Sequence, residues 1–477
     1  DLTLGGLTPD EAEREIYSHI LSRNPEHDFE PTLDRVREAC ALLGDPQHAY
    51  KVVHLTGTNG KTSTSRMIES LLRAHGLSTG LFTSPHLTTF RERIQIDGQP
   101  LSQEALVRLW ARVAPAIDAI DAQSRRDGGP LMSFFEVLTV LGFVAYADAH
   151  VDVLVLEVGI GGARDATNVA RGEVAVLTPM AEDHSNYFVG GVSGVASEKS
   201  GIIKPGATVV SATQPLVAEE IVCGAAARRG ASLRWEGLHH DVLAREASPA
   251  GQIVTLRTLS GTREGVLVPL HGDFQAQNAL VALAATEAAL ELRGLALDDA
   301  AVARGFAGAT SPGRLEVIAA EPTIVVDAAH NPHGVTALAG ALGETFGFES
   351  VVGVVAVLAD KDGEGILAGL EPVVDHVVVT RTASPRATPV EELAAAAIEV
   401  WGAERVSVAR DTAEALDRAT SLAQERDGEV GVLVAGSITL VAEARTLVQR
   451  VHEAEMAHEA PRGLADAGES SAEAVPA

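Results

Sequence analysis

A glycine-rich loop between a predicted strand and a predicted helix constrains the fold of this chain more than any other segment. The run Lys-Val-Val-His-Leu, residues 51–55, is typical of a strand, and apolar residues recur at helical spacing over 67–72. Between them lies Gly-Thr-Asn-Gly-Lys-Thr-Ser, residues 57–63. Glycines let backbone N–H groups approach an anion, and the N-terminus of a helix favours negative charge. This segment therefore predicts an α/β fold with a phosphate-binding loop.

The loop predicts a nucleotide ligand but leaves the reaction open. The residues expected to bind the nucleotide are Gly57, Thr58, Asn59, Gly60, Lys61, Thr62 and Ser63. Lys61 can reach the outer phosphates, and a hydroxyl of Thr62 or Ser63 can bind Mg²⁺ or a phosphate oxygen. Leu55 stands where the general phosphate-loop pattern has its first glycine. Kinases and switch GTPases use the same physics, so other residues must decide the chemistry.

Apolar segments that alternate with helical patterns predict two α/β domains. Buried strands are expected at 151–159, 173–179 and 207–212, and again at 323–330, 351–360, 375–382 and 431–437. Helices are expected at about 8–22, 33–43 and 274–292, and alternating segments within 233–270 predict a small antiparallel patch. We therefore predict a phosphate-loop ATPase domain with a mostly parallel sheet, followed by a Rossmann-like α/β domain.

The predicted domain boundary lies near Thr310-Ser-Pro-Gly-Arg314, where the second series of strands begins. This places an ATP-binding domain at 1–309 and a C-terminal domain at 310–455. Residues 456–477 are rich in Ala, Glu, Gly and Pro without periodicity, which predicts a disordered tail.

The charge balance excludes some classes of partner. The 477 residues include 65 acidic and 37 basic side chains, a formal net charge of −28, which repels nucleic acid and anionic membranes. No run of 18 apolar residues occurs, and Cys40 and Cys223 lack metal-ligand spacing. We expect a cytoplasmic monomer with both cysteines in its core and with neither nucleic acid nor membrane as a partner.

Polar residues at the ends of predicted strands form a candidate metal site. Ser84 follows the strand-like Gly-Leu-Phe-Thr, Glu157 ends a strongly apolar strand, and His184 follows the next strand. Ligands of α/β sheets bind at this edge. A hydroxyl, a carboxylate and an imidazole could hold one Mg²⁺ and leave room for phosphate oxygens. Lys199, at a predicted helix end, taken alone is more often a solvated cation than a functional group.

Ten motifs together resemble the folylpolyglutamate synthases. They occur in the family's order from about residue 10 to about 450: GTNGKT, TSPHL, FFEVLT, EVGIGG with DATN, DH, EKSGIIK, QNA, SPGRLE, DAAHNP and GS. In bacteria this family often includes bifunctional dihydrofolate synthases, and it belongs to the Mur ligase superfamily. Each motif is modestly specific, but the ordered set is strongly so.

The resemblance implies an ATP site and a magnesium site. Residues 57–63 would bind the triphosphate, and Asn278, Arg314 and Asp327 match further nucleotide contacts, so ATP would lie between the domains. Ser84, Glu157 and His184 would hold Mg²⁺. Lys199 matches the family's carbamylated lysine, whose carboxylate-like group can bind a second Mg²⁺. K⁺ is a further candidate cofactor.

The resemblance also implies the substrates and the reaction. His330 and Ser437 match positions associated with L-glutamate, and Phe135 and Asp165 match positions at the pterin-bearing substrate, a folate or dihydropteroate. The implied reaction forms an acyl phosphate on the substrate's carboxylate, which the amine of L-glutamate then attacks. The residues to which catalytic roles would fall are Lys61, Lys199, Asp327 and His330.

Some departures from the family pattern keep alternatives open. The usual Gly-Gly-Arg-x-Asp is Gly161-Gly-Ala-Arg-Asp165 here, Phe274 replaces a frequent histidine, and Thr439 replaces a frequent tyrosine. A ligase acting on a non-folate carboxylate therefore stays open. A cell-wall Mur ligase is disfavoured because only about 50 residues precede the loop, which leaves no room for a further domain. A non-catalytic nucleotide-binding regulator would not need Glu157, His184 and Lys199 together, and a kinase would consume ATP without requiring an amine.

Overall fold

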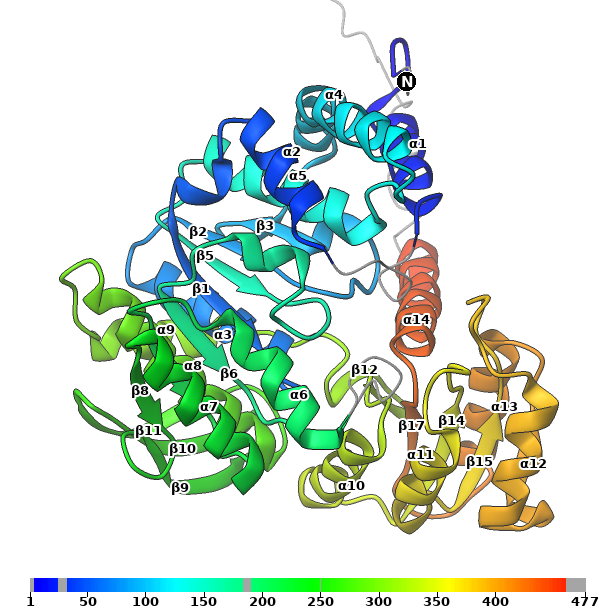
Figure 1. The fold of residues 1–477 in the computed structure, drawn as a ribbon. Helices are drawn as coiled ribbons and strands as arrows, with labels where there is room; N and C mark the ends of the chain where they lie inside the picture. The colour runs from blue at the N-terminus through cyan, green and yellow to red at the C-terminus, as the bar shows by residue number, and fades with distance from the viewer. Residues whose placement is uncertain (1–3, 25–31, 183–189, 249, 460–477) are drawn as a thin grey trace, which may run out of the picture.

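The chain forms two α/β parts, each built on its own sheet (Figure 1). The computed structural model describes residues 4–24, 32–182, 190–248 and 250–459. The larger sheet has the order β4-β3-β2-β5-β1-β6-β7-β8. Its strands are β1 Lys51–Thr56, β2 Thr79–Phe82, β3 Ile94–Ile96, β4 Gln99–Pro100, β5 Val153–Glu157, β6 Val174–Leu177, β7 Thr208–Ser211 and β8 Ser232–Trp235. In the stretch β2-β5-β1-β6-β7-β8 of this order all neighbouring strands are parallel. Strand β3 pairs antiparallel with both β2 and β4.

Helices cover both faces of this sheet because its strands are apolar on both sides. Val52 belongs to a core cluster that also holds buried residues of α1 Pro9–Leu21, α2 Asp34–Leu42, α4 Gln103–Arg126 and α5 Phe134–Asp148. Val53, one residue further, belongs to a second cluster, which holds buried residues of α3 Lys61–Ala74, α8 Asp273–Glu291 and α9 Asp299–Ala307. Two more helices, α6 Gly191–Lys199 and α7 Leu216–Arg229, pack beside β6 and β7. The β1–α3 connection is the predicted phosphate loop.

The antiparallel patch is a separate three-stranded sheet of β9 Asp241–Ser248, β10 Gly251–Thr258 and β11 Gly261–Val268. Its residues Val254, Leu256 and Val268 join the core under α8. The start of the predicted patch was wrong, because β8 pairs parallel with β7 and so extends the main sheet. Cys40 is buried as predicted, but the prediction for Cys223 was wrong, since it lies on an exposed face of α7.

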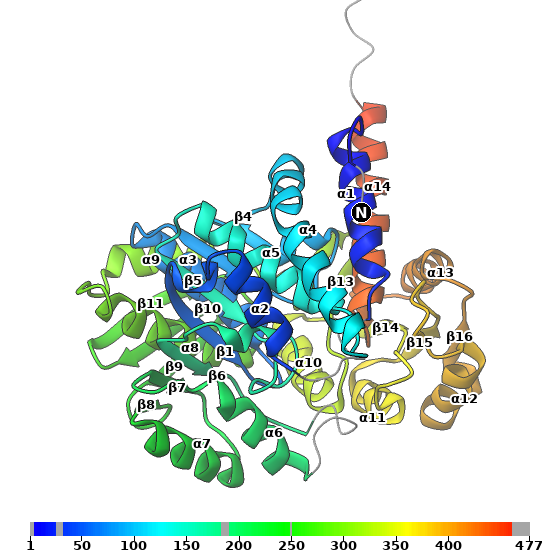
Figure 2. The same cartoon turned by 45° about the horizontal axis from the view of Figure 1, so that its top comes forward.

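The C-terminal part is a six-stranded sheet with the order β12-β13-β17-β14-β15-β16, in which only β12 is antiparallel to its neighbour. Its strands are β12 Glu316–Ala320, β13 Thr323–Asp327, β14 Ser350–Val355, β15 His376–Val379, β16 Val406–Val408 and β17 Val430–Ala435. Figure 2 shows its helices around it: α10 Pro332–Thr345, α11 Gly363–Leu370, α12 Val390–Trp401, α13 Thr412–Gln424 and α14 Ile438–Glu459. The predicted α/β fold class is confirmed for both parts.

The two sheets are connected between α9 and β12. We keep 1–309 and 310–455 as proposed domains on that basis. The last helix extends to Glu459, four residues past the proposed end, and residues 460–477 of the predicted tail lie outside the described residues. In the part of the chain that the structure describes, no helix is long and apolar enough to cross a membrane.

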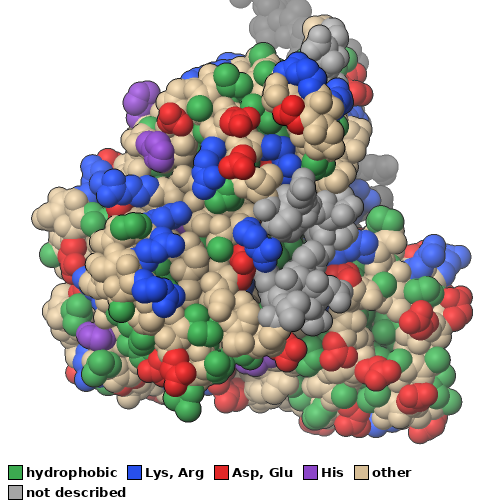
Figure 3. All heavy atoms as spheres, in the orientation of Figure 1, with side chains coloured by type: hydrophobic (Ala, Val, Ile, Leu, Met, Phe, Trp, Pro, Cys, Tyr) green, Lys and Arg blue, Asp and Glu red, His purple; other side chains and the backbone are tan. Residues whose placement is uncertain are grey.

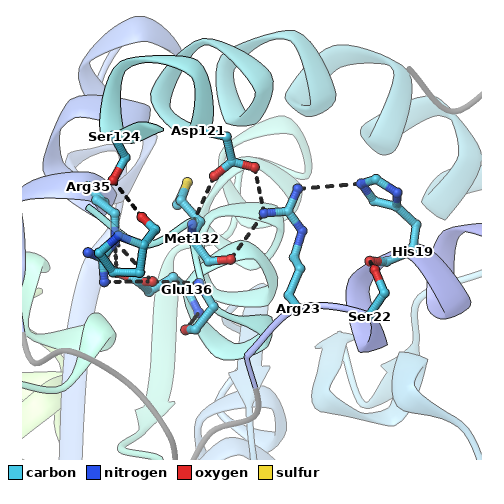
Figure 4. Close-up of polar contacts among 10 residues, drawn as sticks. His19, Ser22, Arg23, Arg35, Asp121, Ser124, Met132 and Glu136 are labelled. Atoms are coloured by element: carbon cyan, nitrogen blue, oxygen red, sulfur yellow. Dashed lines mark hydrogen bonds and ion pairs between the residues drawn. The ribbon is translucent and has the colours of Figure 1, made fainter. Parts of the chain in front are cut away.

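Buried ion pairs attach the N-terminal segment to the helices beneath it (Figure 4). Arg35 on α2 contacts Glu136 in the first turn of α5, with 3.1 Å between Nε and Oε1, and both side chains are about nine-tenths buried. Arg23 contacts Asp121 on α4 at 2.7 Å and also donates to the Met132 carbonyl. Burial raises the pKa of Glu136, and the Arg35 guanidinium opposes that shift. The contact with Arg35 anchors the first turn of α5, which also carries Phe135, a predicted substrate residue.

We expect the Arg35→Met substitution to lower the free energy of unfolding by about 3–5 kcal/mol, because it leaves the carboxylate of Glu136 buried without its partner. Arg37→Met on the same helix is the matched control. It removes only an exposed pair with Asp34, whose side chains are 57% and 74% exposed, and should cost less than about 1 kcal/mol. Urea unfolding followed by fluorescence measures both values. Equal losses in the two variants would show that the buried pair does not stabilise the fold.

Candidate active site

The phosphate loop has the geometry of an anion-binding site. Strand β1 ends at Thr56, and α3 begins at Lys61 with no side-chain cap and no acidic residue in its first turn. Its first N–H groups are therefore not capped by a side chain. Gly60 has a φ of 83°, and a Cβ there would lie 2.4 Å from Oδ1 of Asn278. Only glycine lets the loop pass this close to α8.

Lys61 and Thr62 contact different groups at the start of α3. Lys61 Nζ donates to the carbonyl oxygens of Gly57 at 3.1 Å and Thr58 at 3.3 Å. Thr62 Oγ1 donates to Oε1 of Glu157 at 2.9 Å. Ser63 also lines the cleft, and its Oγ lies 2.7 Å from Oγ of Ser311 in a buried contact. Of the two candidate hydroxyls, Thr62 is therefore the one beside the predicted metal ligand.

Glu157 fits the role of a cation ligand. It ends β5 and is fully buried, and its Oε2 has no hydrogen-bond partner among the described residues. Burial raises the pKa of Glu157 to about 7, although Lys61 and the Thr62 hydroxyl favour its charged form. An unpartnered buried carboxylate oxygen is costly unless a cation or a donor pairs with it. The oxygen-rich set of Glu157, Thr62 and Ser84 suits Mg²⁺.

Of the remaining predicted metal ligands, Ser84 and Lys199 lie within the described residues. Ser84 is buried and lines the same cleft as Glu157. His184 lies outside the described residues. Lys199, the last residue of α6, is buried, and its Nζ donates to the Gly57 carbonyl at 2.8 Å. Within the described ranges, no group of three or more His, Cys, Asp or Glu side chains could hold a metal ion.

A cleft of about 870 Å³ lies between the two sheets and brings most predicted residues together. The residues that line it from the N-terminal part include 58–63, Ser84, Glu157 and Asn278. The residues that line it from the C-terminal part include Arg314, Asp327, His330 and Ser437. Two contacts cross the cleft, since Asn59 Nδ2 lies 2.8 Å from Nδ1 of His333 and Asn331 Nδ2 donates to Oδ1 of Asn59. Nucleotide in the loop would therefore contact both parts.

Asp327 and His330 sit at the end of β13 in well-defined positions. The two carboxylate oxygens of Asp327 accept from the backbone N–H of Leu315 and of Ala329, both at 2.8 Å. Burial raises the pKa of Asp327, and Arg314 opposes that shift. His330 Nδ1 lies 2.9 Å from the carbonyl oxygen of Ala328. Because a carbonyl only accepts, Nδ1 is the donor, and Nε2 of the neutral ring carries the lone pair.

Phe135 and Asp165 line a second, smaller cavity of about 20 Å³. It adjoins the cleft, because Gly159 and Ile160 line both. Asp165 caps a short helix by accepting from the N–H of Thr167 at 3.0 Å, and its other oxygen accepts from Ile160 N at 3.0 Å. These contacts make Asp165 a structural residue of this wall as well as a candidate substrate residue.

Arg164, at the departure from the family pattern, pairs with Glu198. Arg164 turns toward α6, where its Nε lies 3.1 Å from Oε2 of Glu198, the neighbour of Lys199. Its side chain is half exposed.

Several residues of the cleft were not predicted from the sequence. Asp360 and Lys361 follow β14, and Arg386 follows β15, and all three line the cleft. Their position after parallel strands was a usable signal, since ligands bind at the carboxyl edge of such sheets. A further cavity of about 710 Å³ lies at the opposite edge of the large sheet, near Lys51 and Arg171. None of the predicted site residues lines it, so we place the chemistry in the cleft.

Comparisons with known proteins agree with this geometry. The models of the Mur ligase middle domain and of the Mur ligase glutamate ligase domain match residues 131–286 and 313–438. A dihydrofolate synthase/folylpolyglutamate synthase from Mycobacterium tuberculosis is 43% identical over 465 residues, 93% of this chain and 96% of that protein. A Bacillus subtilis protein of the same name is 31% identical, over 87% of this chain and 94% of its own length.

Solved structures show the same fold with a nucleotide bound. Mycobacterium tuberculosis folylpolyglutamate synthase complexed with ADP has a TM-score of 0.89 to this chain at 43% identity, over 92% of this chain and 99% of that one. Escherichia coli FolC in complex with ADP has a TM-score of 0.79 at 29% identity, over 93% and 98%. The chain belongs to the folylpolyglutamate synthase/dihydrofolate synthase family of Mur ligases, which are ATP-dependent acid–amino-acid ligases.

Proposed function

We propose that this chain joins L-glutamate to the carboxylate of folates and of dihydropteroate in a reaction driven by ATP. The observation that carries the proposal is the single cleft in which the phosphate loop, Glu157, Arg314 and His330 meet. Its relatives carry the names of both activities, dihydrofolate synthase and folylpolyglutamate synthase. A cleft shared by two α/β parts allows ATP to be bound by one part and an amino acid by the other.

The proposed first step transfers the γ-phosphoryl group of ATP to the acceptor carboxylate, which gives an acyl phosphate and ADP. Lys61 neutralises charge on the transferred group, and Arg314 does so from the opposite wall of the cleft. The proposed Mg²⁺ ligands are Glu157, Ser84 and His184, and Thr62 lies beside Glu157. Bound Mg²⁺ would neutralise phosphate oxygens there. Asn278 packs against Gly60 and is proposed as a nucleotide contact.

The proposed second step is attack of the L-glutamate amine on the acyl carbon, with release of phosphate. The amine must lose a proton to act as a nucleophile. The lone pair on Nε2 of His330 could accept that proton, and Asp327 fixes the segment that carries His330 through its bond to Ala329 N. Ser437, buried at the end of β17 in the same cleft, is proposed to contact L-glutamate.

Carbamylation of Lys199 is part of the proposal. Lys61 and Lys199 both donate to the carbonyl oxygen of Gly57, so their nitrogens lie within about 6 Å of each other. Two ammonium ions at this distance repel by about 3 kcal/mol at an effective dielectric constant of 20. Carbamylation would replace that repulsion with attraction and would supply an oxygen ligand for a second Mg²⁺. A K⁺ site and a monomeric state stay predictions.

Phosphate release distinguishes this function from its rivals. The enzyme is assayed with ATP and either dihydropteroate or tetrahydrofolate, each with and without L-glutamate. We expect turnover only when acceptor and L-glutamate are both present, and a product whose mass is greater by one glutamate residue. A kinase would release no free phosphate and would not need the amine, and a regulator would bind ATP without turnover. If neither pterin acceptor supports glutamate-dependent turnover, the folate assignment is wrong.

A ligase for a non-folate acid is the second candidate. It is favoured by one observation, that Arg164, which lines the cavity of Phe135 and Asp165, is paired with Glu198. Under this alternative, ATP and L-glutamate are still consumed, but with another carboxylate. Activity with a panel of small carboxylic acids and none with pterins would support it.

A further inference from the structure

His54 is a buried polar side chain that the proposed mechanism does not use. Other histidines lie at the surface, as the face in Figure 3 shows, and water can hydrogen-bond to them there. His54 lies within β1 and has no exposed surface, so the protein must supply its partners. Its Nε2 lies 2.9 Å from Oγ1 of Thr167, and its Nδ1 has no hydrogen-bond partner among the described residues. Within that part of the chain, Thr167 is therefore the one polar contact of this ring.

Thr167 connects His54 to Asp165. Its Oγ1 donates to Oδ1 of Asp165, and its backbone N–H donates to the same oxygen at 3.0 Å. The other carboxylate oxygen accepts from the N–H of Ile160 at 3.0 Å. Thr167 is fully buried, and Asp165 is nearly so. Donors on both oxygens therefore fix the position and the plane of the Asp165 carboxylate.

The direction of each hydrogen bond in this chain follows from the available donors and acceptors. An ionised carboxylate only accepts, so the single hydroxyl hydrogen of Thr167 is used on Asp165. The oxygen of that hydroxyl must then accept from His54, which places the ring hydrogen on Nε2. Burial, with the charge of Lys204 adding to it, lowers the pKa of His54 to about 3, so the ring is neutral. A neutral ring that donates from Nε2 keeps the Thr167 hydroxyl directed at Asp165.

Strand β1 holds the same wall of the cavity at a second point. Thr56 comes two residues after His54 and so lies on the same face of the strand. Its Oγ1 donates to the carbonyl of Gly161 at 2.6 Å. The phosphate loop begins directly after Thr56. One face of β1 therefore makes two side-chain contacts to the segment 161–167, and the same strand leads into the proposed nucleotide site.

Asp165 lines the small cavity together with Phe135 and Ile160, whereas His54 and Thr167 do not line it. The proposed function places the pterin-bearing substrate at Asp165, and a pterin ring carries N–H groups that a carboxylate can accept. We propose that His54 and Thr167 are positioning residues for Asp165: Thr167 holds the carboxylate, and His54 holds the Thr167 hydroxyl in its donating orientation. The inference rests on the proposed function and names buried residues beyond the cavity that determine how well the pterin acceptor binds.

Steady-state kinetics of variants at Thr167 and His54 test the inference. Thr167→Val removes the hydroxyl and nearly keeps the shape, so KM for dihydropteroate should rise by about 10-fold or more while KM for ATP changes less than about twofold. Thr167→Ser keeps the hydroxyl and should stay within about threefold of wild type. His54→Leu should raise KM for dihydropteroate by about 3- to 10-fold. His54→Gln, whose amide can donate to Thr167, should recover most of that loss.

Thr286→Val is the matched control. Thr286 is fully buried in α8, its Oγ1 donates to the carbonyl of Ala282 at 2.8 Å, and it lines neither the cleft nor the small cavity. Its KM values should stay within about twofold of wild type. The Asp165→Ala background completes a double-mutant cycle. Because Thr167 is proposed to act through Asp165, Thr167→Val should change KM for dihydropteroate by less than about twofold in that background.

Unchanged KM for dihydropteroate in both Thr167→Val and His54→Leu would overturn the inference. Equal increases for dihydropteroate and ATP would also overturn it, since they would indicate a structural role, as would an undiminished effect of Thr167→Val in the Asp165→Ala background. A wild-type enzyme without glutamate-dependent turnover of dihydropteroate would instead contradict the proposed function. Circular dichroism and thermal unfolding show whether each variant is folded, and the two His54 variants decide the question if Thr167→Val is not.

Discussion

The Lys61→Ala variant is expected to lose ATP turnover by at least about 100-fold while it keeps its fold, as is typical when one charge-stabilising donor is removed from an active site. Lys61 Nζ rests on the carbonyl oxygens of Gly57 and Thr58 at the edge of the cleft. Its side chain is only half-buried and belongs to none of the hydrophobic core clusters, so its removal should not unfold the protein. Phosphate release in the presence of acceptor and L-glutamate measures the loss.

A second lysine at the other end of β1 serves as control for Lys61→Ala. Lys51 makes a partly exposed ion pair with Glu173, far from the phosphate loop along the strand. Lys51→Ala should keep near-normal turnover, because such surface pairs contribute about 1 kcal/mol or less. Thermal unfolding of both variants checks that each is folded. Near-normal turnover of Lys61→Ala would contradict the assignment of residues 57–63 as the triphosphate site.

The strands and helices were largely predictable because their patterns are local. The strand–loop–helix segment at 51–74 needed only apolar periodicity and glycine, and the buried strands of both sheets needed only short apolar runs. The strand β8 was misassigned for the same reason. Whether Ser232–Trp235 pairs parallel or antiparallel depends on β7, which is not its hairpin partner, and no local pattern carries that information. Cys223 was misplaced because exposure depends on which face of α7 meets the sheet.

The sequence predicted that most candidate residues share one cleft, but it did not predict their contacts. Residues at strand ends could be expected in one cleft, since parallel strands bring their carboxyl ends to one edge. The pairing of Ser63 with Ser311 could not be expected, because it joins residues 248 positions apart across the link between the two sheets. Nor could the sequence show that Arg164 turns to Glu198, or that His54 contacts Thr167. Such contacts follow from the packing of whole elements.

The Lys199→Ala variant is expected to be strongly impaired and to regain activity when a small carboxylic acid such as formate or acetate is added. Lys199 is buried beside Lys61 and the Gly57 carbonyl, in a small cavity that residues 158–161 also line. If the working form is a carbamate, the alanine variant lacks a carboxylate group and leaves space where the side chain ended. A small acid can enter that space and restore both the negative charge next to Lys61 and an oxygen ligand for Mg²⁺.

The specificity of the rescue decides between a carbamate and a plain ammonium at Lys199. Formate should restore Lys199→Ala but not Lys61→Ala, because the second variant has lost a cation rather than a carboxylate. A small amine should show the reverse preference. Wild-type turnover should also fall when dissolved carbon dioxide is removed and should return when bicarbonate is added, since a carbamate forms from carbon dioxide and a neutral lysine. Rescue of Lys199→Ala by an amine and not by an acid would mean that Lys199 acts as a cation, and its repulsion with Lys61 would then have to be offset by bound phosphate.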